Sequence, residues 1–196
     1  MIYLNSKNEW EKIYSQPGYR NKNKYPFDII ISVVNSRFDI SKSTEKIKIL
    51  ELGSGWGNNL KFFRDIGANY LGIEQSITAV EHCNDIGLKA KHDNFVSFDY
   101  PINFYDLIID RQSLQHNNLE SINSVVKSVH SSLKKNGLFF SQFVISDNYK
   151  VQTTYLQPEE YESILSNFSS VSINIHSMKE FNSDNSASYM NVLAVK

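Results

Sequence analysis

The sequence of 196 residues contains a single cysteine and no long apolar run. One cysteine cannot form a disulfide within the chain, and the polar N-terminus lacks the apolar stretch of a secretory signal, so we expect a cytoplasmic protein. No segment approaches the roughly 20 consecutive apolar residues that a membrane-spanning helix needs. We therefore expect no membrane partner.

An excess of charge of one sign is also lacking. The chain has 20 basic and 21 acidic residues, a formal net charge of −1 at pH 7. Binding to a phosphate backbone draws on clustered positive charge, so we expect no nucleic-acid partner. His82, His92, His130 and His176 lie scattered along the chain, and the carboxylates do not cluster. The pattern predicts no metal site.

A polar N-terminal segment precedes a series of regular apolar segments. We expect a helical cap over residues 1–46, with helical spacing over 27–38, and one compact domain over 47–196. In that domain the pattern predicts strands at 46–52, 69–74, 88–92, 105–110, 138–144, 171–176 and 189–196, with helices at 58–67, 76–86, 122–133 and 158–165. Alternation of strands and helices predicts a parallel sheet with helices on both faces, and the last two strands are expected to pair antiparallel.

A glycine-rich loop follows the first expected strand. It contains Gly53, Gly55 and Gly57 and is preceded by Glu51. Doubly wound sheets bind ligands at the carboxyl ends of their strands, where this loop lies. Glycines let the backbone turn sharply and approach a ligand closely. Glu74 ends the second strand 21 positions after Gly53, where a carboxylate can accept hydrogen bonds from ribose hydroxyls. These features predict a cofactor that contains adenosine.

Two classes of cofactor fit a glycine loop with a later acidic residue. The dinucleotide pattern G-x-G-x-x-G requires glycine at position 58, where this chain has Asn58. The observed G-x-G-x-G, with Glu51 before it, resembles the first motif of class I S-adenosylmethionine-dependent methyltransferases. The resemblance continues through residues 72–74, 92–95, 105–110 and 133–138, with Asn136 where that family commonly has glycine.

The resemblance implies an α/β, Rossmann-like methyltransferase fold. Its sheet has seven strands, mostly parallel with an antiparallel last strand, and helices on both faces. S-adenosylmethionine is the implied cofactor, and the protein is expected to be a monomer or a homodimer. The implied cofactor-binding residues are Glu51, Gly53, Ser54, Gly55, Trp56, Gly57, Glu74, Gln75, Asp93, Asn94, Phe95, Asp110 and Arg111, together with Tyr14 and Arg20 of the cap.

The loop after the fourth strand, residues 110–116, faces the cofactor's methyl group in that family. We expect Asp110 and His116 to be catalytic, with His116 as a general base because imidazole titrates near neutral pH. Alternatively, His116 packs against the adenosine or caps the next helix. Arg111 could hold a phosphate or carboxylate of the methyl acceptor, or pair with an acid for structure.

The expected reaction is methyl transfer to an oxygen of a small polar acceptor. Loops 146–157 and 177–188 are polar, which suits a hydrogen-bonding acceptor. By analogy with small stand-alone enzymes, the acceptor is expected to be a sugar or sugar-phosphate, such as a precursor of a surface polysaccharide. The alternatives are a methyltransferase for another small metabolite, a noncatalytic cofactor-binding protein of the same fold, and a nicotinamide-dependent oxidoreductase.

Overall fold

The computed structural model describes residues 7–16, 25–42, 44–147, 153–179 and 186–196. Seven strands form one sheet in the order β3-β2-β1-β4-β5-β7-β6. The strands are β1 (Lys48–Leu52), β2 (Asn69–Glu74), β3 (Ala90–His92), β4 (Tyr105–Arg111), β5 (Leu133–Asp147), β6 (Ser170–Lys179) and β7 (Ser186–Val195). Strand β7 runs antiparallel to β5 and β6, and the other pairs are parallel. The predicted fold class is confirmed.

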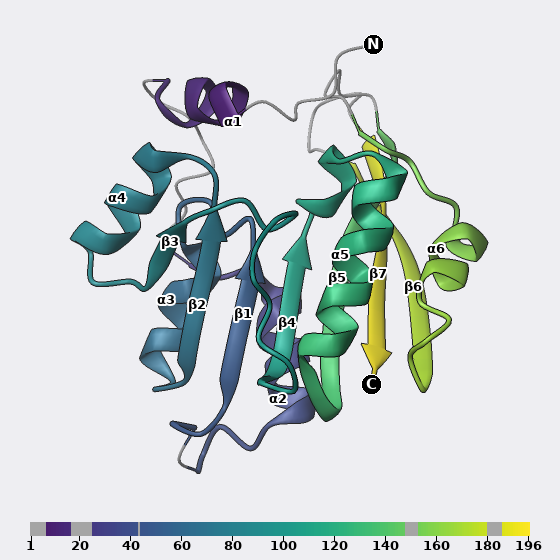
Figure 1. Cartoon of the computed structure of the whole chain (residues 1–196), viewed down its shortest axis with the longest axis horizontal. Coiled ribbons are helices and arrows are strands. Elements are labelled where there is room, and N and C mark those ends of the chain that lie inside the picture. The colour runs from purple at the N-terminus through teal and green to yellow at the C-terminus, as the bar shows by residue number, and fades with distance from the viewer. Residues whose placement is uncertain (1–6, 17–24, 43, 148–152, 180–185) are drawn as a thin grey trace.

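Helices cover both faces of this sheet (Figure 1). They are α1 (Lys7–Tyr14), α2 (Asp28–Arg37), α3 (Asn58–Asp65), α4 (Ile77–Asp85), α5 (Leu119–Ser132), α6 (Pro158–Ile164) and the short 3-10 helix η1 (Leu114–His116). Helices α2, α3 and α4 pack on one face, whereas α5 and α6 pack on the other.

The core consists of one apolar cluster on each face. On one side, Val125 and Val129 of α5 pack with Phe139 and Phe143 of β5. On the other side, the apolar residues of α2 and α3 pack together against the sheet: Ile30, Val33, Val34, Leu60 and Phe63. Helix α2 thus contributes to the core, although it lies in the segment predicted as a cap. The boundary at residue 46 stays a prediction.

Local sequence signals account for most helix ends. The side chain of Ser76 accepts a hydrogen bond from the Ala79 N–H at 3.2 Å and begins α4, as expected for a cap. Pro158 occupies the first turn of α6. Gly67 has a φ of +73° just after α3, as predicted for a helix end.

Strand β5 begins earlier than its pattern predicts. Leu133 already pairs with Tyr105, whereas the prediction places the strand start at Leu138. The register then shifts between Tyr105 and Leu107, because the chain turns at Asn136, whose φ is +62°. Asparagine tolerates this left-handed conformation, which explains why it can replace the commoner glycine.

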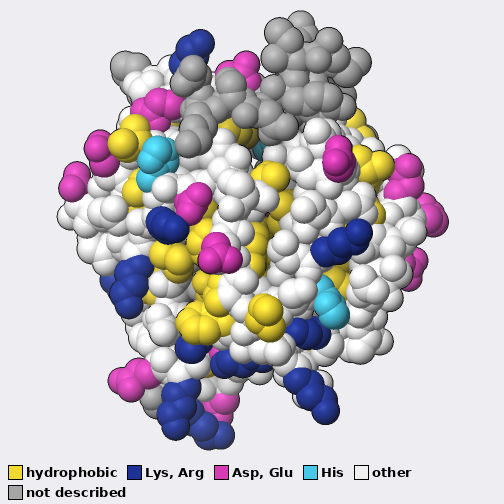
Figure 2. Space-filling view, viewed as in Figure 1, with side chains coloured by type: hydrophobic (Ala, Val, Ile, Leu, Met, Phe, Trp, Pro, Cys, Tyr) yellow, Lys and Arg dark blue, Asp and Glu magenta, His cyan; other side chains and the backbone are white. Residues whose placement is uncertain are grey.

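The carboxyl ends of β1, β2 and β4 point to the edge of the sheet where α1 lies (Figure 1). Figure 2 shows one face of the molecule, with apolar side chains gathered over its middle and lysine and arginine side chains concentrated toward the edge opposite α1. Within the described part of the chain, no helix has the length and apolar character needed to cross a bilayer.

Candidate active site

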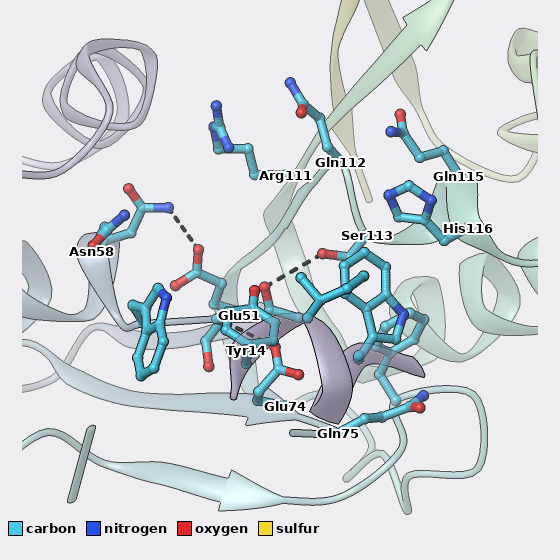
Figure 3. Close-up of a pocket in the computed structure, with 18 of the residues that line it drawn as sticks. Tyr14, Glu51, Asn58, Glu74, Gln75, Arg111, Gln112, Ser113, Gln115 and His116 are labelled. Carbon is cyan, nitrogen blue, oxygen red and sulfur yellow. Dashed lines mark hydrogen bonds between the residues drawn. The ribbon is translucent and has the colours of Figure 1, made fainter. Parts of the chain in front are cut away.

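A pocket of about 600 Å³ lies at the carboxyl ends of β1, β2 and β4. This volume is within the range of roughly 300–1,000 Å³ that small-ligand and cofactor sites occupy. The sheet order reverses between β1 and β4, and doubly wound folds bind ligands at such a point. The predicted site residues that line the pocket are Tyr14, Glu51, Gly53, Ser54, Gly55, Trp56, Glu74, Gln75, Phe95, Arg111 and His116 (Figure 3).

The glycine loop forms one wall of the pocket. Gly53 and Gly55 have φ values of +65° and +51°, which other residues rarely adopt. A Cβ atom on Gly53 would lie 2.6 Å from the Cβ of Ser113, and one on Gly55 would lie 2.6 Å from the hydroxyl of Tyr14. Both positions therefore favour glycine for the backbone conformation, and Gly53 also for the space beside Ser113.

Glu74 connects the end of β2 to this loop. One carboxylate oxygen accepts a hydrogen bond from the Gly55 N–H and the other from the Ser76 N–H, each at 2.9 Å. Burial raises the pKa of Glu74. A carboxylate oxygen accepts more than one hydrogen bond, so both oxygens keep capacity for a ligand. A contact between Glu74 and a ribose stays a prediction.

Glu51 lies at the end of β1 and is almost completely buried, with 3% of its surface exposed. Its Oε1 atom accepts a hydrogen bond of 2.6 Å from Nδ2 of Asn59, in α3. Burial raises the pKa of Glu51 to about 8, against an opposing effect of the nearby Arg111 cation. The carboxyl group is therefore poised to lose a proton when a cation binds beside it.

Several buried polar atoms around the pocket have no hydrogen-bond partner in the described part of the chain. They are Oε2 of Glu51, Oγ of Ser54, Oε1 of Gln75 and Nε of Arg111. A buried polar atom without a partner costs about 1–3 kcal/mol, and most such atoms in proteins are satisfied. Their concentration at one pocket indicates a polar ligand that supplies the missing partners.

The predicted catalytic and cofactor-binding roles of Asp110 stay predictions. Its side chain is fully buried and does not line the pocket. One oxygen accepts hydrogen bonds from the N–H groups of Ser113 and Leu114, both at 2.9 Å, and the other accepts from the Ser141 hydroxyl at 2.8 Å. Burial raises the pKa of Asp110 to about 6. These hydrogen bonds fix the loop that leads to His116.

Gly57, Asp93 and Asn94 do not line the pocket either. A Cβ atom on Gly57 would lie 2.6 Å from Leu88 and 2.8 Å from the Cys83 sulfur, so this glycine allows close packing around α4. Asp93 forms an ion pair of 2.7 Å with Lys91 and accepts a hydrogen bond from the Asn94 N–H. Contact of Asp93 and Asn94 with the adenine stays a prediction. Arg20 lies outside the described residues.

Helix α1 covers the pocket. The ring of Trp10 lies 4.9 Å from the ring of His116, and the ring of Tyr14 lies 5.3 Å from that of Trp56. The helix is attached to the start of α4 by Glu11, whose carboxylate accepts hydrogen bonds from the Ser76 hydroxyl at 2.8 Å and the Thr78 N–H at 3.2 Å. The predicted cap residue Tyr14 is therefore placed at the pocket.

Other lining residues come from segments whose role was predicted without naming the residue. Gln112, Ser113 and Gln115 lie in the loop 110–116, Thr153 lies in the loop 146–157, and the cap over 1–46 contributes Trp10, Ile13, Gln16 and Phe27. The sequence analysis did not identify the rest: Asn58, Asn59, Asn117, Val144 and Tyr189. Asn58 and Asn59 follow the glycine loop directly, which is the one signal that could have identified them. Within the described ranges, no three His, Cys, Asp or Glu side chains are grouped to hold a metal ion.

A family model described as "Methyltransferase domain" matches residues 24–177, which is more than half of the chain. Among curated proteins, the chain is 25% identical over 123 residues to sphingolipid C9-methyltransferase 2 of Gibberella zeae. The match covers 58% of this chain and 23% of that protein, so the chain spans about a quarter of the relative's length.

Solved structures of methyltransferases share the fold. One from Archaeoglobus fulgidus, dependent on S-adenosylmethionine, has a TM-score of 0.68 at 12% identity, over 86% of this chain and 94% of that chain. Phosphoethanolamine N-methyltransferase 2 of Haemonchus contortus, in complex with S-adenosylmethionine, has a TM-score of 0.68 at 13% identity, over 97% of this chain and 57% of that chain. The fold is that of S-adenosylmethionine-dependent methyltransferases. The chain belongs to the methyltransferase-domain family.

Proposed function

We propose that this chain transfers a methyl group to an oxygen atom of a small polar acceptor, a sugar or sugar-phosphate. The observation that carries the proposal is the division of the pocket into two parts (Figure 3). Glu74 and Gln75 lie on one side of Glu51, and Arg111, Gln112, Gln115 and His116 lie on the other. The first side fits a nucleoside, and the second presents hydrogen-bonding groups to an acceptor.

The residues present fit S-adenosylmethionine. Oε2 of Glu51, which lacks a partner within the described chain, suits the ammonium group of the methionine part. Gly53 and Gly55 leave room for close approach of the backbone, and Glu74 suits the ribose hydroxyls. The bound cofactor supplies an electrophilic methyl group on a sulfonium, a good leaving group.

The protein itself would align the acceptor with the methyl group, exclude water and take up the proton of the acceptor hydroxyl. A base is needed when the acceptor is a hydroxyl, and the imidazole of His116 lines the acceptor side of the pocket. We propose that a ring nitrogen of His116 takes the proton from the acceptor hydroxyl. Trp10 and Tyr14 cover the pocket from α1 and would exclude bulk water from the reacting groups.

The acceptor side favours a hydroxylated molecule over an apolar one. Besides Arg111, its side chains carry amides and an imidazole: Gln112, Gln115 and His116 (Figure 3). The names of two similar proteins indicate acceptors of other kinds, a sphingolipid and phosphoethanolamine. We propose that the setting is the cytoplasm, since a single buried cysteine suits a reducing compartment.

A screen of sugar phosphates and nucleotide sugars tests this function. The purified chain is incubated with S-adenosylmethionine and each acceptor, and formation of S-adenosylhomocysteine is measured. With an active acceptor, His116→Gln should lower kcat by about 100-fold and change the cofactor Kd by no more than a few-fold. An unchanged kcat would remove the base role of His116. Cofactor binding without turnover of any acceptor would support the noncatalytic alternative.

A further inference from the structure

Arg111 is a cation on the pocket wall that lacks a counterion. It is the only Lys or Arg among the described lining residues, and it forms no ion pair with any described carboxylate. Its Nε atom is buried without a hydrogen-bond partner in the same described part of the chain. A buried guanidinium that lacks a partner is costly, and a ligand that supplies an anion would remove the cost.

The guanidinium is held in a fixed orientation by an aromatic ring. Its Cζ atom lies 3.2 Å from the centroid of the Phe27 ring, a cation–π contact. The Phe27 N–H donates to Oδ1 of Asn59 at 3.2 Å, and Asn59 in turn donates to Glu51. A guanidinium stacked on a ring keeps its N–H edge available, and that planar fork matches the oxygens of phosphate or carboxylate.

The carboxyl groups around Arg111 do not neutralise its charge. Glu51 has a pKa raised to about 8 by burial, so it is largely protonated at neutral pH. Asp110 directs its oxygens to Ser113, Leu114 and Ser141. Burial lowers the pKa of Arg111 to about 10, which still leaves the side chain positively charged at pH 7. Arg111 therefore presents a positive charge at the pocket that forms no ion pair with a described carboxylate.

Two amide side chains that follow Arg111 along the pocket wall, Gln112 and Gln115, are oriented by hydrogen bonds to the sheet (Figure 3). Nε2 of Gln112 donates to Oε1 of Gln142 at 2.8 Å, so Oε1 is the atom that Gln112 can offer as an acceptor. Oε1 of Gln115 accepts from the Val144 N–H at 2.7 Å, so its NH₂ group can act as a donor. Gln112 also has a φ of +60°, a conformation that is uncommon outside glycine and concentrates at functional sites.

We propose that the methyl acceptor is an anion, whose phosphate or carboxylate group binds Arg111 and the amide of Gln115 while a hydroxyl group donates to Gln112. This inference rests on the proposed function and narrows its acceptor to acids, which excludes neutral sugars. It also assigns Arg111 to the acceptor and not to the carboxylate of the cofactor.

The test uses the side-chain Nε–H signal of Arg111 in the ¹⁵N-labelled full chain, assigned by its absence in Arg111→Gln. Inorganic phosphate and methyl phosphate are titrated into the protein, with and without saturating S-adenosylhomocysteine, at constant ionic strength set with chloride. We expect a saturable shift of the signal with a millimolar Kd for both phosphates. The shift should persist when S-adenosylhomocysteine is bound. Lys42→Gln removes a charge from an exposed loop and should leave the titration unchanged.

Three results would overturn the inference. The first is a shift by phosphate that does not saturate or that chloride reproduces. The second is loss of phosphate binding on addition of S-adenosylhomocysteine but not of methylthioadenosine, which lacks the amino-acid part; Arg111 would then hold the cofactor's carboxylate. The third is wild-type phosphate affinity in Arg111→Gln, read from the backbone amides of Gln112 and Ser113. A failure of the proposed function would be seen separately, as absent binding of S-adenosylhomocysteine or as absent turnover of every acceptor in the screen.

Discussion

Glu51 and Asn59 form a buried hydrogen bond of 2.6 Å between the end of β1 and the start of α3. This bond uses one carboxylate oxygen and leaves the other, which has no partner in the described part of the chain, at the pocket. The same residue has a pKa raised to about 8 by burial. The proton on Glu51 therefore couples the stability of the free protein to pH.

Because the folded protein holds the Glu51 proton more tightly than the unfolded chain does, stability should fall as pH rises from about 4.5 to about 8. The glutamine side chain of Glu51→Gln stays neutral at every pH, so the variant should not lose stability as the pH rises. Relative to the wild type, the variant should gain roughly 2–4 kcal/mol in free energy of unfolding between pH 5 and pH 8.5. Urea unfolding at both pH values measures the difference. The exposed Glu120→Gln is the control, and an equal pH trend in Glu51→Gln and wild type would contradict the assignment.

Gly53→Ala should weaken binding of S-adenosylhomocysteine by about tenfold or more, because the new Cβ atom collides with Ser113 and alanine strains the backbone at a φ of +65°. Gly87→Ala is the matched control: its φ is +76°, but nothing lies within 4 Å of an added Cβ atom. It should lose about 1 kcal/mol of stability and keep its affinity. Calorimetric titration of both variants distinguishes the effect of backbone strain at a positive φ from the effect of the collision with Ser113. Equal affinities would place the cofactor away from the loop.

Asp110→Ala should destabilise the protein by about 2–4 kcal/mol, because two buried N–H groups lose their acceptor. When an active acceptor is known, kcat of Asp110→Ala should fall much more than its cofactor affinity. Asp110→Asn should recover part of the lost kcat. Tyr161→Phe removes the hydroxyl that donates to Ser141 and should cost about 1 kcal/mol with little effect on turnover. A purely structural role for Asp110 would lower stability and leave kcat of the folded fraction unchanged.

Glu11→Gln should weaken the attachment of α1 to α4. Burial acts to raise the pKa of Glu11, but hydrogen bonds from Thr78 and Ser76 outweigh it, and the pKa is lowered overall. The ionised form is therefore the one that holds the helix. We expect the dissociation rate of S-adenosylhomocysteine to rise by roughly three- to tenfold, as stopped-flow fluorescence of Trp10 can report. Glu81→Gln, an exposed change on α4, should leave the rate unaltered.

The fold could be predicted from the sequence because its signals are local. Alternating apolar runs, the cap at Ser76 and the turn at Gly67 each depend on neighbours in the chain. The glycine loop and Glu74 could be predicted for the same reason: both follow directly from the end of a strand. The early start of β5 could not, because it depends on pairing between Leu133 and Tyr105, far apart in sequence.

The acceptor side of the pocket could be predicted only in part. His116 and Arg111 follow β4 directly, whereas Trp10, Phe27 and Tyr189 reach the pocket from α1, the start of α2 and β7. No pattern in the sequence links these distant segments. The contacts of Asp110 could not be predicted either: an acidic residue at a strand end suggests a site, but only the structure shows that loop N–H groups and Ser141 donate to its oxygens.

Calorimetric titration of the purified chain measures whether this pocket binds S-adenosylmethionine. S-adenosylmethionine and S-adenosylhomocysteine are titrated separately, with NAD as the comparison ligand. We expect micromolar Kd values for the first two and no detectable binding of NAD. Binding of NAD, or of none of the three, would contradict this expectation.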